Sequence, residues 1–404
     1  MFDTSGIGVF LGLDVGKGDH HAHGLTPAGK TVHDKRLPNS EPKLRALFDK
    51  LREKFGTVLV IVDQIANIGA LPVAVARDSG CEVAYLPGLS MRRAADLYPG
   101  EAKTDARDAF VIADTARTMP HTLRSIEVTD ETSAELAMLV GFDDDLAGEA
   151  TRVSNRLRGL LTQIHPSLER VLGPRVHHPA VLMMLERFGS PAELRKAGRR
   201  RLVTLIRPKA PRMAERLVED IFTALDEQTV VVPGTRAATT IVPSLARQLA
   251  AVLDQRRTLE AQIKALLEAH PLSQLLMSLP GVGIRTGATL LVTIGDGKTF
   301  ATAGHLASYA GLAPVTKSSG SSIRGEHAPH RGNRQLKRAM FLSAFAALHD
   351  PASRTYYDKQ RSAGKTHTQA LLRLARRRID VIFAMLGNGT FYEPREPKNV
   401  ELAA

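Results

Sequence analysis

The chain has little cysteine and few aromatic residues. Its 404 residues include one cysteine and no tryptophan, and only 5% are aromatic. A single cysteine, Cys81, excludes a disulfide framework and a zinc site, so we expect it to be a buried strand residue and any metal to be held by oxygen ligands. The sequence lacks an apolar run of 18 residues and a signal-peptide pattern, which predicts a cytoplasmic protein that does not enter a membrane.

Positive charge is in excess. The chain contains 54 Lys and Arg against 42 Asp and Glu, a formal net charge of +12. Such an excess concentrates polyanions around a protein, and nucleic acid is the obvious partner. The length is sufficient for two or three domains.

The first part of the chain, residues 1–125, predicts an α/β domain. Short apolar runs at 8–17 and 57–64 each end in an acid and indicate buried strands, and a hairpin follows the first run. Leucine and phenylalanine at helical spacing predict a helix after Ser40. The resulting order is strand, strand, strand, helix, strand, helix, strand, helix, which is typical of a ribonuclease-H-like domain.

Helical patterns dominate the remainder. Residues 126–270 predict long amphipathic helices, as in a coiled-coil linker region, that pair with each other or with another subunit. Residues 271–404 predict a mainly α C-terminal domain.

Four aspartates suggest a metal site. Asp14 and Asp63 end two strands that should be neighbours, and Asp105 and Asp108 share one face of a helix. Several carboxylates that converge on hard cations such as Mg²⁺ are what two-metal phosphoryl transfer requires.

Ordinary helix capping is the alternative for the helical pair. Acids in a first turn stabilise the helix dipole, and Thr104 is a suitable N-cap. An acid that ends an apolar strand is costly unless it meets a cation or solvent, so Asp14 and Asp63 favour the metal site. The aspartates without such positions are expected to be solvated: Asp19, Asp78, Asp96 and Asp114.

Glycines in "SLPGVGIRTGATLL" predict a phosphate-binding turn. Gly281 and Gly283 allow close approach of backbone amides to a phosphate, and Thr286 would donate as well. The pattern resembles the hairpin of helix-hairpin-helix proteins, which contact the DNA backbone. A helix connector without a ligand is the alternative.

A serine-rich segment follows. In "KSSGSSIRG", four serines lie near Lys317, Arg324 and Arg331. Basic side chains would neutralise a phosphodiester that a serine attacks, although this composition is also that of a linker. The clusters "RKAGRRR", "RPKAPR" and "RLARRR" would bind phosphates, or form solvated helix faces.

Taken together, these motifs resemble a family, the "one-ten" group of bacterial insertion-sequence transposases (116/110/902). Members pair an N-terminal RuvC-like DEDD domain with a C-terminal serine transposase domain. The resemblance spans nearly the whole chain through "GLDVGK", "VIVDQ", "EAKTDARDA", "SLPGVGIRTGATLL", "YAGLAPVTKSSG" and "RGNRQLKRAM".

The resemblance implies roles for particular residues. The four aspartates, Asp14, Asp63, Asp105 and Asp108, fall on the DEDD positions, and Ser319 falls on the nucleophilic serine. Asp63 departs from the usual glutamate and is one methylene shorter. Ser318 and Ser321 are register alternatives for the nucleophile.

The family also implies a mechanism and partners. It predicts RNA-guided recombination, in which a structured non-coding bridge RNA pairs with donor and target DNA, Mg²⁺ is the cofactor, and Ser319 forms a covalent link to DNA. It further implies a homodimer or homotetramer, a site composed from two subunits, and association with the nucleoid. Two other functions fit the residues: a Mg²⁺-dependent Holliday-junction-type resolvase or nuclease, and a non-catalytic RNA- or DNA-binding scaffold.

Overall fold

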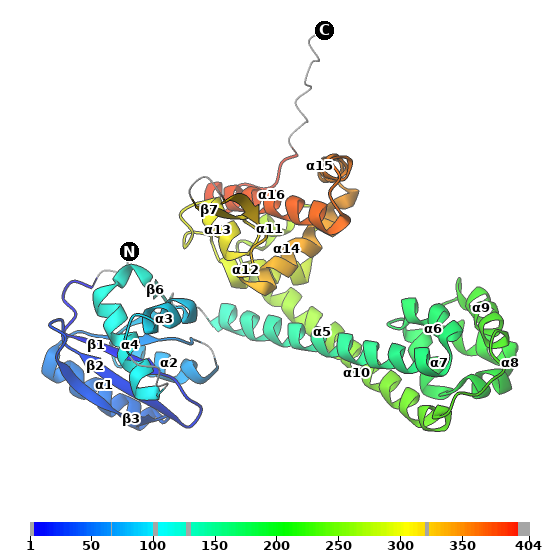
Figure 1. The fold of residues 1–404 in the computed structure, drawn as a ribbon, viewed down its shortest axis with the longest axis horizontal. Helices are drawn as coiled ribbons and strands as arrows, with labels where there is room; N and C mark the ends of the chain where they lie inside the picture. The colour runs from blue at the N-terminus through cyan, green and yellow to red at the C-terminus, as the bar shows by residue number, and fades with distance from the viewer. Residues whose placement is uncertain (1–3, 66, 100–103, 127–130, 320–322, 395–404) are drawn as a thin grey trace, which may run out of the picture. The chain divides into compact units, whose positions relative to one another are not determined.

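The computed structural model describes residues 4–65, 67–99, 104–126, 131–319 and 323–394. The chain divides into two compact units, Met1–Thr129 and Asp130–Ala404 (Figure 1). Within the described residues, no helix is long and apolar enough to cross a membrane.

One mixed sheet forms the centre of the N-terminal unit. Its strands are β1 (Val9–Asp14), β2 (Asp19–Leu25), β3 (Thr31–Pro38), β4 (Val58–Val62), β5 (Glu82–Tyr85) and β6 (Arg124–Ser125). They lie in the order β3-β2-β1-β4-β5-β6. The central pairs β1–β4 and β4–β5 are parallel, and the outer pairs are antiparallel.

Helices cover both faces of this sheet. They are α1 (Glu41–Phe55), α2 (Ala70–Asp78), α3 (Gly88–Ala95) and α4 (Asp105–Thr118), with short 3-10 turns at η1 (Asn67–Gly69) and η2 (Pro120–Thr122). One hydrophobic core includes residues of α1 and α2, and a second core includes residues of α4. Burial on both faces explains why β4 is continuously apolar.

The predicted α/β class is confirmed and the predicted strands and helices follow one another as expected, whereas the ribonuclease-H-like identity stays a prediction. Helix α3 and the short strand β6 are additional elements that the predicted order does not include. Cys81 is buried as predicted, but it lies immediately before β5 and not within the strand.

Gly12 sets how closely α4 approaches the sheet. A Cβ atom at this position of β1 would lie 2.6 Å from the backbone nitrogen of Ala113, in the middle of α4. Only glycine permits this approach of a helix backbone to a strand. The contact brings the first turn of α4 toward the end of β1.

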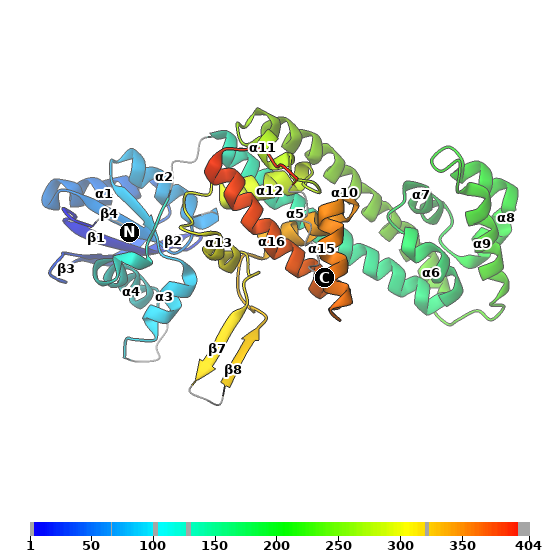
Figure 2. The same ribbon diagram turned by 90° about the horizontal axis from the view of Figure 1, so that it is seen from above.

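Two long helices form the frame of the C-terminal unit. They are α5 (Glu131–Ile164) and α10 (Thr235–Ala269), which lie side by side (Figures 1 and 2). Of the two arrangements expected for the long helices, the structure shows pairing with each other. Leu157 of α5 and Leu249 of α10 belong to the same core.

Shorter helices pack at the two ends of this frame. Between α5 and α10 the chain forms α6 (Pro166–Leu172), η3 (Gly173–Arg175), α7 (Pro179–Arg187), α8 (Pro191–Ile206) and α9 (Ala214–Asp226). After α10 come α11 (Ser273–Met277), α12 (Ile284–Ile294), α13 (Ala303–Tyr309), α14 (Arg334–Ala346), η4 (Ala347–His349), α15 (Pro351–Ser362) and α16 (His367–Asn388). One hydrophobic core runs through both groups. The predicted domain boundaries at 125 and 270 stay predictions.

The serine-rich segment forms a β-hairpin that the sequence did not indicate. Strands β7 (Val315–Ser319) and β8 (Ile323–His327) pair in antiparallel fashion and extend away from helices α11 to α16 (Figure 2).

Replacing Gly12 by alanine should destabilise the N-terminal unit by about 2–4 kcal/mol, because the added methyl group forces α4 away from β1. Hydrogen exchange of the full chain, read by mass spectrometry, should show lower opening free energies for the amides of β1 and α4. Gly18→Ala is the matched control, since a Cβ at Gly18 meets open space. Equal protection in the two variants would contradict the close contact.

Candidate active site

The structure brings the four predicted aspartates together. Asp14 is the last residue of β1 and Asp63 directly follows β4, its parallel neighbour, in which Val62 pairs with Leu13. Asp105 begins α4 and Asp108 lies one turn further along. All four line one pocket of the N-terminal unit. Carboxylates from two strand ends and one helix therefore meet at the same edge of the sheet.

Burial and mutual repulsion disfavour ionisation in this pocket. Burial, together with the charges of Asp63, Asp108 and Asp105, raises the pKa of Asp14 from 3.8 to about 7. Burial, and to a smaller degree the charge of Asp108, also raises the pKa of Asp63, although backbone hydrogen bonds oppose this shift. Two partly buried carboxylates that resist losing their protons are a common property of functional sites.

The residues have the chemistry of a site for a hard cation. The Oδ1 atom of Asp63 is buried and has no hydrogen-bond partner, so an oxygen ligand is available inside the pocket. Within the described residues, however, no three acidic, histidine or cysteine side chains form a group that could hold a metal ion as they stand. The donor set fits Mg²⁺, and the side chains would have to draw closer to share it.

Capping and the candidate site coexist at the start of α4. The Thr104 hydroxyl accepts a hydrogen bond from the backbone amide of Arg107 at 3.3 Å, as the capping interpretation predicts. Capping is therefore carried out by Thr104, which leaves the carboxylates of Asp105 and Asp108 in the pocket.

Sequence reasoning missed a polar cluster beside the pocket. Asp114, expected to be solvated, accepts hydrogen bonds from the Tyr98 hydroxyl at 2.6 Å and from Arg117. Burial and this hydrogen bond raise the pKa of Tyr98 to about 12, so it remains a proton donor. The Arg107 guanidinium donates to the Tyr98 carbonyl at 3.0 Å. Tyr98 and Arg107 both line the pocket, as do Asp19 and Asp96, which are exposed as expected.

The turn at residues 281–283, which we call the glycine turn, precedes α12 and contains two glycines with different surroundings. Gly281 has φ of 78°, and a Cβ there would lie 2.7 Å from the backbone nitrogen of Ala347, so this residue allows close packing against η4. Gly283 is exposed, has open space around it and precedes the first turn of α12. Of the two, Gly283 is the one whose backbone is accessible to a ligand.

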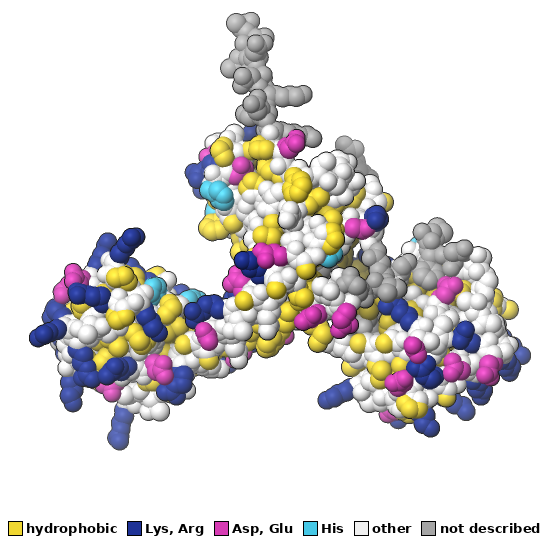
Figure 3. Space-filling model, turned by 180° about the vertical axis from the view of Figure 1, so that it is seen from behind, with side chains coloured by type: hydrophobic (Ala, Val, Ile, Leu, Met, Phe, Trp, Pro, Cys, Tyr) yellow, Lys and Arg dark blue, Asp and Glu magenta, His cyan; other side chains and the backbone are white. Residues whose placement is uncertain are grey.

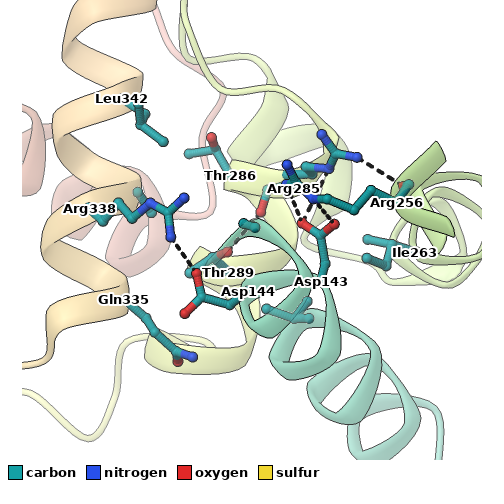
Figure 4. Close-up of a pocket in the computed structure, with 13 residues that line it drawn as sticks. Asp143, Asp144, Arg256, Ile263, Arg285, Thr286, Thr289, Gln335, Arg338 and Leu342 are labelled. Carbon is teal, nitrogen blue, oxygen red and sulfur yellow. Dashed lines mark hydrogen bonds and ion pairs between the residues drawn. The ribbon is translucent and has the colours of Figure 1, made fainter. Parts of the chain in front are cut away.

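Thr286 lines a second pocket, between α5, α10, α12 and α14 (Figure 4). Its neighbour Arg285 and Arg256 of α10 both contact the buried carboxylate of Asp143, at 3.3 and 2.9 Å. Arg338 pairs with Asp144 at 2.6 Å on the other side. These ion pairs join α12 and α14 to the long helices and fix the position of the turn.

The serine hairpin places Ser319 at the end of β7, where it pairs with Ile323. Ser318 pairs with Arg324 and Lys317 with Gly325, which puts these residues on one short ribbon. Ser321, a register alternative for the nucleophile, lies outside the described residues. Arg331 is exposed and follows the ribbon.

One arginine of the basic cluster "RLARRR" has a structural role. In "RLARRR", Arg378 is buried and its guanidinium donates to the Ser343 hydroxyl at 2.7 Å and to the Pro280 carbonyl. Burial lowers the pKa of Arg378 to about 10. The expectation that it binds phosphate is wrong, because its donors hold the glycine turn against α14.

Comparison with known proteins defines the class. A transposase family model of the IS110 DEDD type matches residues 11–166, and the model "Transposase IS116/IS110/IS902 family" matches residues 273–358. The chain is thus a transposase, an enzyme of DNA transposition.

Relatives along the full length specify the family. The chain is 76% identical to the uncharacterized 43.6 kDa protein of insertion element IS110 from Streptomyces coelicolor, over 100% of both chains. It is 37% identical to the 44.8 kDa protein of IS116 from Streptomyces clavuligerus, over 96% of this chain and 97% of that one. A pilin gene-inverting protein of Moraxella lacunata is 33% identical over 35% of this chain and 46% of its own. The chain belongs to the IS116/IS110/IS902 family of transposases.

The raised pKa of Asp14 predicts a pH-dependent effect of Asp14→Asn. The folded state holds this proton up to about pH 7, whereas the unfolded chain releases it near 3.8, so the wild type loses stability as pH rises between these values. At pH 8 the free energy of unfolding of the variant should exceed that of the wild type by about 2 kcal/mol. This is less than the whole pKa shift corresponds to, because the pocket is open to water, which screens the charges.

Pulse proteolysis of the full chain in urea, with peptides from β1 and β2 as the readout, measures this difference at pH 4 and pH 8. The control is Asp19→Asn, whose carboxylate lines the same pocket and pairs with Arg36 at 3.6 Å. A gain from Asp14→Asn of equal size at both pH values would show that repulsion is not its cause.

Proposed function

We propose that this transposase recombines DNA by RNA-guided strand exchange, with Ser319 as nucleophile and the four aspartates as ligands of Mg²⁺. The observation that carries the proposal is the convergence of Asp14, Asp63, Asp105 and Asp108 on one pocket, with the Oδ1 atom of Asp63 unpaired. A carboxylate group of this kind in a chain of net charge +12 suits a reaction on a polyanion.

When bound, Mg²⁺ would neutralise and polarise a phosphodiester. The aspartates then have a positioning task, since Ser319 supplies the attacking oxygen. A bond forms between the Oγ atom of Ser319 and phosphorus, and the bond from phosphorus to a deoxyribose oxygen breaks. The serine hydroxyl loses its proton, and the released deoxyribose oxygen takes one up. A hydroxyl of the partner strand later attacks the phosphoserine and restores Ser319. The reaction exchanges strands without net hydrolysis.

Phosphate contacts would come from the C-terminal unit. Gly283 and Thr286 belong to the start of α12, and Lys317, Arg324 and Arg331 belong to the serine hairpin or follow it. Gly281 supports the turn from behind. Such contacts hold a nucleic acid without reading its bases, which fits a protein whose sequence choice is delegated to a bridge RNA. A homodimer or homotetramer would allow one subunit's serine to act beside another's aspartates.

Metal binding can be tested apart from catalysis. Saturating Mg²⁺ should stabilise the wild type, by about 2.7 kcal/mol at a hundredfold excess over the dissociation constant. Asp63→Asn should abolish this stabilisation, because it removes the negative charge of the carboxylate whose Oδ1 atom has no hydrogen-bond partner. The control is Asp78→Asn, an acid that pairs with Arg45 at 2.7 Å outside the pocket. Thermal unfolding with and without Mg²⁺ is the measurement, and an unchanged response in Asp63→Asn would count against the site.

Ser319→Ala distinguishes strand exchange from hydrolysis. The variant should lose the covalent protein–DNA adduct and the joined products while it still binds DNA, and reactions without the RNA should give no joined product. Denaturing gels of labelled DNA measure both, with Ser318→Ala as the control expected to remain active. Undiminished cleavage by Ser319→Ala would favour a resolvase or nuclease that activates water, and an inactive wild type would favour a scaffold.

A further inference from the structure

The basic residues of helices α6 to α9, which we call the distal lobe (residues 166–226), fall into two groups. Lysine and arginine side chains gather over this lobe, which lies at the left in Figure 3. One group forms ion pairs at 2.7–3.2 Å: Arg170 with Glu227, Arg195 with Asp226, Arg199 with Glu219 and Arg207 with Glu215. The other group lines a groove between α7 and α8.

A glycine kinks helix α8 within "RKAGRRR". Gly198 has φ of 76° and ψ of 158°, so α8 is two helical segments joined at a kink. A Cβ at Gly198 would meet open space, which means that the backbone conformation, and not crowding, requires glycine. Beyond the kink, Arg199 lies over the ring of Phe222 on α9 at 4.2 Å, whereas Arg200 and Arg201 line the groove.

The groove has an uncompensated positive charge. Arg187, Arg200, Arg201 and Lys209 are exposed and line it, and no acidic residue does. In the part of the chain that the structure describes, none of these four forms an ion pair, whereas Glu215, Glu219, Asp226 and Glu227 engage the first group. Four free cations around one groove attract a polyanion.

The walls of the groove offer little for reading bases. Phe188 is buried, with the guanidinium groups of Arg187 and Arg201 over its ring at 6.0 and 5.6 Å, so the ring holds the arginines and is closed to a stacking base. The hydroxyl of Thr204 donates to the Arg200 carbonyl at 3.0 Å. What remains for a ligand is a set of charged donors, which suits phosphates.

The groove adjoins a path toward the glycine turn. It shares Met183 and Lys209 with a trough along α7 and α10, and the trough shares Arg256 and Arg285 with the pocket that contains Thr286. Within the trough, Glu186 and Asp254 are neutralised by Arg247 and Arg257, at 2.8 and 3.0 Å. The third acid that lines the trough, Glu260, pairs with Arg285 at 3.3 Å. Each acid of the trough therefore has a cationic partner, which reduces its repulsion of a strand that follows the path.

We propose that the distal groove binds the phosphate backbone of duplex DNA that flanks the recombination site, without regard to its sequence. The occupant is DNA because the family acts on DNA. The proposal rests on that function and is independent of the serine and Mg²⁺ steps.

The test is binding of the full-length protein to a labelled duplex of unrelated sequence, followed by fluorescence anisotropy over a range of salt concentrations. Arg200→Gln with Arg201→Gln should weaken binding about tenfold and lower the slope of log K against log salt by about 2, since each lost phosphate contact removes about 0.9. Adding Arg187→Gln and Lys209→Gln should lower the slope by about 3.5 in total.

The matched control is Arg170→Gln with Arg195→Gln, which removes the same charge from ion-paired residues of the same lobe. It should leave the slope nearly unchanged, and circular dichroism should show all variants folded. An equal effect of the control, or no effect of either pair, overturns the proposal. A loss seen with an RNA duplex of equal length but not with DNA would overturn it in favour of RNA. The assay measures binding of an unrelated duplex and no joined product, so failure of the catalytic proposal would leave the result unaffected.

Discussion

The contact of helix α4 with strand β1 at Gly12 is the constraint on which the candidate site depends. Without a side chain at Gly12, the backbone of α4 lies directly on the strand, and its first turn reaches the strand end that carries Asp14. Asp63 arrives there because β4 pairs in parallel with β1. Acids from three separate segments of the chain thus become neighbours, and their mutual repulsion disfavours the folded state in exchange for a functional arrangement.

Whether a charged residue of this protein is available to a ligand depends on its ion pairs more than on how many charges lie nearby. Acids are concentrated in the pocket of the N-terminal unit, and the arginines of the distal lobe are divided between ion pairs and a free groove. Arg378 and Arg200 both belong to arginine triplets, yet one is a buried clamp on the Pro280 carbonyl and the other is an exposed cation. Only the second is available to a phosphate.

The strength of local signals explains which parts could be predicted. Asp14 and Asp63 were recognisable because acids that end apolar strands stand out, and the long amphipathic helices had a clear period. The β7–β8 hairpin was missed because its polar residues give no alternation to detect. The hydrogen bond of Tyr98 with Asp114 was missed because its partners are 16 residues apart and no local pattern connects them.

By itself the sequence determined that the chain begins with an α/β domain and continues with helices. It also determined the positive net charge, which attracts polyanions, and, through its motifs, the resemblance to a transposase family. These properties depend on composition and short spacing, which are present in the unfolded chain. The tertiary structure decided which acids share a pocket, which glycine supports a turn from behind and which arginines remain unpaired. Those outcomes depend on distances between residues far apart in sequence, and such distances exist only after the helices and strands have packed.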